Sequence, residues 1–214
     1  MACSIYRLAP KSRLALQREC QAAGTEVPLT LLGRSKEDTY AEIDKALGSF
    51  LRKYALDTTG RMATLNSFIF GNFPRINFCG FYTVRAPGEL LQVGPYQGEM
   101  LACGTIAWGK GVCGTAAAAG AAQVVPDVRA LDNYIACDED TLSEIVLPVY
   151  GTRYHNEDGG AAAPGGGSGG SDGSDGSAPP AKKLIAVLDI DGDALGAFDE
   201  VDRRCLEALL AKYI

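Results

Sequence analysis

Histidine is almost absent from this 214-residue chain, and its single copy, His155, lies in a stretch dominated by glycine and serine. A side chain in such a flexible stretch cannot be held within hydrogen-bond reach of a nucleophile. Ser-His-Asp and Cys-His catalytic arrangements are therefore excluded. Any thiol that reacts must be activated by a helix terminus, by hydrogen bonds or by the substrate itself.

The chain also lacks a basic excess and a long apolar run. Its 20 Lys and Arg residues against 26 Asp and Glu residues give a net charge of -6, which predicts no nucleic-acid partner. No apolar segment approaches the roughly 18 to 20 residues needed to cross a bilayer, and no signal peptide is evident, so we expect no membrane partner and a cytoplasmic location. Mitochondrial targeting is the alternative, because several basic residues precede the first acid, Glu19: Arg7, Lys11, Arg13 and Arg18.

Closely spaced cysteine pairs are missing as well. The seven cysteines are scattered through the sequence, and no two of them are separated by two to four residues. A secreted disulfide framework is therefore not expected, and neither is a zinc site, since the chain has one histidine. The thiols either fill the core or carry redox chemistry.

The length and composition indicate one domain. Hydrophobic residues make up 47% of the chain and charged residues 21%, which suffices for a single α/β core. Residues 1–34 show no sustained periodicity and are interpreted as an N-terminal extension, and residues 35–214 as the domain. Residues 151–181 are rich in Gly, Ser, Pro and Asp, and we expect a disordered insertion there. It separates two apolar strands, at 143–150 and 182–191, that would otherwise form a hairpin.

Periodicity predicts the remaining elements. A helix is expected to begin after Ser35, a capping residue, and to place apolar residues such as Ile43 and Leu47 on one stripe. We further expect a helix at 61–70, strands at 76–84, 101–107 and 123–125, and a closing amphipathic helix from 198 onward. These elements predict an α+β fold.

The segment from Gly109 to Gly114 matches GxGxxG, a pattern of dinucleotide-binding folds. The helix after it spans only about two turns, and no regular strand-helix-strand succession surrounds it. We therefore interpret the segment as a tight turn followed by a short Ala-rich helix. Cys113 would lie near the start of that helix, where backbone N–H groups lower a thiol pKa. The alternative is that Cys113 simply packs in the core.

Carboxylates lie at the ends of the two clearest strands. Glu144 opens one strand, and Asp189 and Asp191 alternate with apolar residues in the other. Acids at a strand end are often solvated surface groups. An acid between two apolar residues such as Leu188 and Ile190 is less easily explained that way, so at least one of these carboxylates is a candidate functional group.

Several blocks of this chain closely resemble the free methionine-(R)-sulfoxide reductases, which are stand-alone enzymes of GAF fold. The resemblance runs from about Met62 to Cys205, and its blocks match in content, order and spacing: INFCGFY, VGPYQGEMLAC, GKGVCGTAAAAG, YIACDEDTLSEIVLP and IAVLDID. It implies a GAF-like α+β fold with a central six-stranded antiparallel sheet flanked by helices, commonly dimeric, around a pocket for free methionine sulfoxide.

The resemblance also implies roles for three cysteines. The family pattern suggests Cys137 as the attacking thiol and Cys103 as its resolving partner, with Cys113 as an additional redox or structural thiol. The helix-terminus argument favours Cys113 as the nucleophile, so the two arguments disagree, and we adopt the family pattern.

Pocket residues follow from the same resemblance. Glu144, Asp189 and Asp191 match carboxylates that would bind the substrate ammonium and help protonate the sulfoxide oxygen, and Tyr82 matches a pocket aromatic. Phe78 stands where the family usually has tryptophan, so an indole N–H that could contact the sulfoxide is lost.

The chemistry implied is reduction of free L-methionine-(R)-sulfoxide through a cysteine sulfenic acid and an intramolecular disulfide. A thioredoxin-like protein, supplied ultimately by NADPH, would restore the thiols, and no bound cofactor or metal is needed. The alternative is a GAF-type sensory module that binds a small ligand without catalysis.

Overall fold

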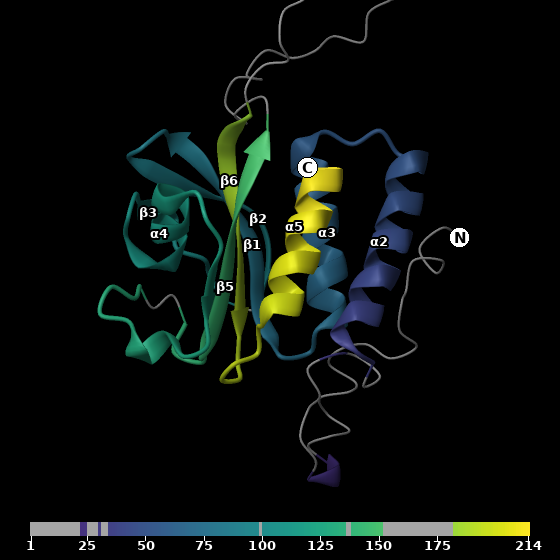
Figure 1. The fold of residues 1–214 in the computed structure, drawn as a ribbon, viewed down its shortest axis with the longest axis horizontal. Helices are drawn as coiled ribbons and strands as arrows, with labels where there is room; N and C mark the ends of the chain where they lie inside the picture. The colour runs from purple at the N-terminus through teal and green to yellow at the C-terminus, as the bar shows by residue number, and fades with distance from the viewer. Residues whose placement is uncertain (1–21, 25–29, 31–33, 99, 136–137, 152–181) are drawn as a thin grey trace, which may run out of the picture.

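The computed structural model describes residues 22–24, 30, 34–98, 100–135, 138–151 and 182–214 (Figure 1). Most of the expected N-terminal extension, Cys137 and nearly all of the expected insertion lie outside the described residues. The described part is built on one antiparallel sheet in the order β3-β2-β1-β6-β5-β4. The strands are β1 (Ile76–Ala86), β2 (Leu90–Gly98), β3 (Thr105–Ala107), β4 (Gln123–Val125), β5 (Ser143–Gly151) and β6 (Lys183–Gly192).

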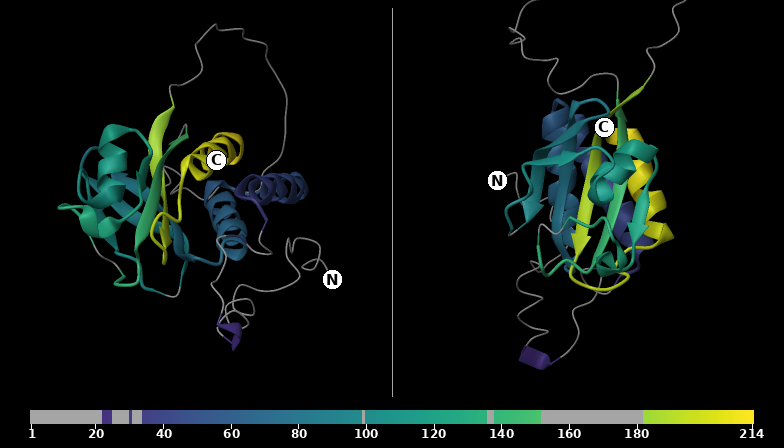
Figure 2. Two further views of the ribbon diagram at one scale, coloured as in Figure 1. Left: turned by 60° about the horizontal axis from the view of Figure 1, so that its bottom comes forward. Right: turned by 90° about the vertical axis from the view of Figure 1, so that its left-hand side faces the viewer.

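Helices cover both faces of the sheet, as Figures 1 and 2 show. On one face pack α2 (Lys36–Lys53), α3 (Thr58–Asn72) and α5 (Glu200–Tyr213), and on the other lies the short α4 (Gly111–Ala119). The α2 helix begins where the sequence predicts, because the Ser35 side chain accepts a hydrogen bond from the backbone N–H of Asp38. None of the described helices is long and apolar enough to span a bilayer.

Side chains of β1 alternate between two cores, as the pleat of a strand requires. Cys79 and Phe81 pack with α2, α3 and α5, whereas Phe78 and Tyr82 pack on the α4 side. Because both faces are covered, β1 is buried along most of its length. The acids discussed below lie on the α4 side.

The long β5–β6 hairpin confirms the expected pairing of the two clearest strands. The register runs from Ser143 opposite Gly192 to Gly151 opposite Lys183. The pairing therefore continues up to both ends of the expected insertion, whose own residues, 152–181, are not described.

Two sequence-based boundaries were wrong. The second helix begins at Thr58 rather than Arg61, because Asp57 caps it by accepting a hydrogen bond from the N–H of Gly60. The strand expected at 101–107 is confined to Thr105–Ala107, the residues that pair with β2. Leu101 is 86% exposed, so its apolar character does not reflect a buried strand.

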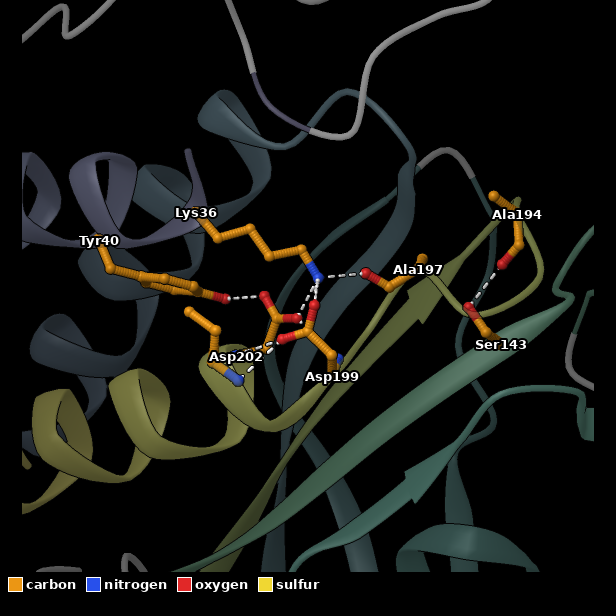
Figure 3. A network of polar contacts seen from close by, with 8 residues as sticks. Lys36, Tyr40, Ser143, Ala194, Ala197, Asp199 and Asp202 are labelled. Carbon is orange, nitrogen blue, oxygen red and sulfur yellow. Dashed lines mark hydrogen bonds and ion pairs between the residues drawn. The ribbon is translucent and has the colours of Figure 1, made fainter. Parts of the chain in front are cut away.

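A buried polar network fixes the start of α5 against α2 (Figure 3). The Lys36 ammonium donates to the backbone carbonyl of Ala197 at 2.7 Å and pairs with the carboxylates of Asp199, at 2.8 Å, and Asp202. The Tyr40 hydroxyl donates to the second oxygen of Asp202 at 2.9 Å. Since Asp202 is 1% exposed, this pairing supplies the partners that a buried charge requires.

The same region holds the start of β5. The hydroxyl of Ser143 donates to the backbone carbonyl of Ala194 at 2.7 Å, which ties β5 to the loop after β6 (Figure 3). Arg75 pairs with Asp193 in that loop, with Nε 2.6 Å from Oδ1. These contacts fix the strand ends that carry Glu144 and Asp191.

Candidate active site

A small pocket opens on the α4 side of the sheet. Its walls combine strand residues, the start of α4 and the loop before β5: Tyr82, Ile106, Gly111, Val112, Cys113, Tyr134, Ile135, Glu144, Asp189 and Asp191. The pocket thus brings together Tyr82, Cys113 and all three carboxylates that the sequence singled out.

The strand register explains why the acids converge. Asp189 and Asp191 are two residues apart on β6, so their side chains share one face of the sheet. Glu144 of β5 lies directly opposite Asp191 in the antiparallel ladder. All three are buried, with exposed fractions of 5% for Glu144, 6% for Asp189 and 7% for Asp191.

Burial and mutual repulsion disfavour the charged forms of these acids. Burial raises the pKa of Glu144 well above its ordinary value, and the nearby charges of Asp189 and Asp191 raise it further. The pKa of Asp191 is raised by burial and then by Asp189 and Asp138. Burial also raises the pKa of Asp189, to about 6, while contacts with Cys113 and Glu144 act in the opposite direction.

Cys113 lies where expected but with the opposite electrostatics. It follows the first residues of α4, yet it is 3% exposed and faces Asp189 and Glu144. Burial, and then the charges of these two acids, raise its pKa well above the ordinary thiol value. The expectation that the helix terminus lowers the pKa of Cys113 was therefore wrong, because burial and two nearby carboxylates outweigh the helix.

The two aromatic candidates have different positions. Tyr82 lines the pocket, whereas Phe78 is not among the lining residues. The ring of Phe78 lies 6.4 Å from that of Tyr82 and is stacked at 5.4 Å on the ring of Tyr96. Being 1% exposed, Phe78 supports the wall from within the core.

The remaining candidate thiols are placed only in part. Cys103 packs beside the α4-side core and is engaged in a disulfide. The other described cysteines, Cys79, Cys113 and Cys205, are free. Cys137 lies outside the described residues.

Sequence reasoning missed part of the pocket lining. Tyr134 and Ile135 line the pocket, and Ile135 packs against Gly111, whose φ of +58° and missing side chain permit this approach. Burial, followed by the charges of Asp191 and Glu144, raises the pKa of the Tyr134 hydroxyl. The signal that could have revealed the loop was the proximity of both residues to Cys137 in the chain.

Asn77 anchors the residues that follow the same loop. Its side-chain N–H groups donate to Asp138 Oδ2 at 3.1 Å and to the Thr141 hydroxyl at 3.0 Å. Asn77 precedes Phe78 on β1, so it connects the sheet to the segment leading into β5. Its role was not evident from the sequence.

Comparisons with known proteins extend this picture. No family model matches the chain. The free methionine-R-sulfoxide reductase of Escherichia coli is 30% identical over 181 residues, which cover 83% of this chain and 88% of that protein. The chain therefore belongs to the free methionine-R-sulfoxide reductase family of GAF-domain proteins.

Solved structures of similar proteins confirm the GAF-like fold. The free methionine-R-sulfoxide reductase of Neisseria meningitidis, solved in complex with its substrate, is 31% identical, with a TM-score of 0.62 over 83% of this chain and 87% of that one. A putative GAF sensor protein of Burkholderia vietnamiensis is 32% identical, with a TM-score of 0.64 over 85% and 94% of the two chains. The chain is thus related to oxidoreductases.

Proposed function

We propose that this protein reduces free L-methionine-(R)-sulfoxide to L-methionine with cysteine thiols as the reductant. The observation that carries the proposal is a pocket walled by Glu144, Asp189, Asp191 and a thiol, with no Lys or Arg among its described lining residues. Membership of the family supplies the substrate class.

The acids suit the ammonium group of a free amino acid. Placing negative charge in a buried pocket is unfavourable unless an opposite charge compensates for it. A substrate ammonium supplies that charge, and its binding would favour ionisation of the acids that surround it. A peptide-bound sulfoxide carries no ammonium beside its side chain and would leave the acids uncompensated.

Unequal pKa values allow the acids to divide their tasks. With a pKa of about 6, Asp189 is mostly ionised at neutral pH and is suited to bind the ammonium. The pKa values of Glu144 and Asp191 lie well above their ordinary values, so these groups can hold a proton for the sulfoxide oxygen. Acids with raised pKa values commonly serve as proton donors in active sites.

The thiol chemistry takes two steps in this proposal. The sulfur of Cys137 attacks the sulfoxide sulfur, the S–O bond breaks, and the oxygen remains on Cys137 as a sulfenic acid while methionine leaves. The thiol of Cys103 then attacks that sulfenic sulfur, which forms a disulfide and releases water. The disulfide state of Cys103 supports its role as the resolving thiol.

Cys113 has a secondary role in this scheme. Its burial and raised pKa disfavour the thiolate that a nucleophile needs, which supports the choice of Cys137. A thioredoxin-like protein, reduced ultimately by NADPH, would regenerate the thiols by exchange. A homodimer and a cytoplasmic location stay predictions.

A coupled assay tests the proposal. Oxidation of NADPH by thioredoxin reductase and thioredoxin is followed after addition of free L-methionine-(R)-sulfoxide, with the S epimer and an N-acetylated, amidated sulfoxide as controls. We expect turnover of the free R epimer and at least about a hundredfold loss in kcat/KM for the blocked substrate, since the acids then lose their charged partner. Binding of the free R epimer without turnover would instead support a sensory module, the role that the name of the Burkholderia vietnamiensis protein suggests.

A further inference from the structure

Three potential metal ligands from separate elements meet in the pocket. The sulfur of Cys113 on α4 and carboxylate oxygens of Glu144 on β5 and Asp189 on β6 all lie within 4.8 Å of one another, and all three residues are buried. Their positions are 31 and 45 residues apart along the chain, so no motif spacing reveals the cluster. The sheet and α4 together create it.

A second observation points to a missing ligand. Asp189 is only 6% exposed, and its buried Oδ1 accepts no hydrogen bond from any described residue. A buried carboxylate oxygen without a partner carries a large desolvation cost. Because Asp189 lines the pocket, a cation bound there would relieve that cost.

We propose that Cys113, Glu144 and Asp189 form a binding site for a divalent thiophilic cation, Zn²⁺, and that its occupation inhibits the enzyme. The inhibitory part rests on the proposed function, in which Asp189 binds the substrate ammonium and Glu144 holds a proton for the sulfoxide oxygen. Zinc and substrate would therefore compete for the pocket.

The ligand set favours zinc over the hard cations. Zinc is bound tetrahedrally by three protein ligands and a water in many sites, and both cysteine sulfur and carboxylate oxygen are among the ligands it accepts. Magnesium and calcium require six or more oxygen ligands and do not select a thiolate. Ligand atoms of a tetrahedral zinc site are about 3.3–3.8 Å apart, given Zn–ligand distances of about 2.0–2.3 Å. The ligand atoms of the cluster lie within 4.8 Å of one another, so they would move closer together to hold a zinc ion.

Direct binding tests the site without any turnover. The protein is first oxidised, so that the disulfide removes Cys103 from competition, and zinc is titrated against a chromogenic chelator. Co²⁺ then serves as a spectroscopic probe, since cobalt bound to a thiolate gives a near-ultraviolet charge-transfer band. We expect one zinc per chain, the cobalt band, and no displacement of zinc by excess Mg²⁺.

Matched variants locate the ligands. Cys113→Ser should abolish the cobalt band and weaken zinc binding at least tenfold, and Glu144→Gln should weaken it similarly with the band retained. Cys205→Ser, at a free thiol outside the cluster, should change neither. Circular dichroism verifies that each variant is folded, and Glu144→Gln keeps the test decisive if Cys113→Ser does not fold.

The outcomes separate this proposal from the function itself. Zinc that fails to bind, or binds equally well to Cys113→Ser and Glu144→Gln, overturns the metal site whether or not the protein reduces methionine sulfoxide. In the coupled assay, a zinc-buffered titration should raise the apparent KM without changing kcat. Zinc binding without any turnover of the sulfoxide would overturn the proposed function and the inhibition while leaving the site.

Discussion

Glu144 and Asp191 face each other directly across the β5–β6 ladder, so two carboxylates occupy one cross-strand pair. Side chains in such a pair are about 4.5–5.5 Å apart at Cβ, and like charges there are destabilising. Ser143, next to Glu144, and Asp193, just beyond Asp191, tie these strand ends to their surroundings, which holds the acids together. This pair of acids therefore lowers the stability of the fold, as is often seen at functional sites.

The first prediction follows from that pair. Glu144→Gln should raise the free energy of unfolding at neutral pH by about 1 kcal/mol, because an acid with a raised pKa must take up a proton when the chain folds and glutamine need not. It should also lower kcat/KM by about a hundredfold or more through loss of the acid. Urea denaturation and the coupled assay measure both effects, with Glu89→Gln at an exposed position as the control. A variant that is less stable and fully active would contradict the interpretation.

The second prediction concerns the dependence of stability on pH. The pKa of Asp189 is raised from 3.8 to about 6, so the folded state retains its proton to higher pH than the unfolded state does. Its contribution is thus fully present below about pH 4 and is lost as the pH rises through about 6. Glu144 and Asp191, also raised, extend this loss to higher pH.

Asp189→Asn should remove that contribution. As the pH rises from 4 to 6, wild type should lose stability that the variant keeps. The variant's free energy of unfolding should therefore rise relative to that of wild type by on the order of 1 to 3 kcal/mol. Urea titrations across this range measure the difference, and Asp132→Asn, at an exposed acid, serves as the control. Parallel curves for Asp189→Asn and wild type would show that its pKa is not raised.

A third prediction tests the close packing of Gly80 against Phe78 and Tyr96. A Cβ atom on Gly80 would lie 2.6 Å from the Phe78 ring and 2.5 Å from Cβ of Tyr96, so Gly80→Ala should cost about 1–3 kcal/mol of stability. Gly71 of α3 is exposed and has nothing within 4 Å of such an atom, so Gly71→Ala should instead stabilise by about 0.5–1 kcal/mol. Thermal unfolding of the two variants compares them, and equal effects would refute the close packing.

Local rules predicted the elements that have strong local signals. The capping side chain of Ser35 and the apolar run of β6 were readable from the sequence, and strand alternation correctly places Asp189 and Asp191 on one face. The raised pKa of Cys113 could not be predicted from the sequence, because the acids that raise it belong to β5 and β6, far from α4 along the chain. Tyr134 was missed for a related reason, since a loop without periodicity gives no sign of which pocket its residues line.

The resemblance supplied what periodicity could not. It grouped Glu144 with Asp189 and Asp191, which are distant in sequence and are joined in space by the β5–β6 register. It also placed Phe78 near the site, and in the structure that ring lies beside Tyr82 but is not among the residues that line the pocket.

The last prediction separates the roles of the thiols, because a nucleophile and a resolving thiol fail in different ways. Cys137→Ser should abolish even a single turnover, since a hydroxyl is a far weaker nucleophile and no histidine is available to activate it. Cys103→Ser should form about one methionine per active site and then stall at a sulfenic acid that thioredoxin recycles poorly. Cys113→Ser should retain substantial recycling, because burial beside two acids disfavours its thiolate.

Rapid-quench measurement of methionine compares the three variants, with Cys205→Ser as the control. An intact first turnover in Cys137→Ser together with a lost one in Cys113→Ser would transfer the attack to Cys113, and substrate binding would then have to overcome the raised pKa of that thiol.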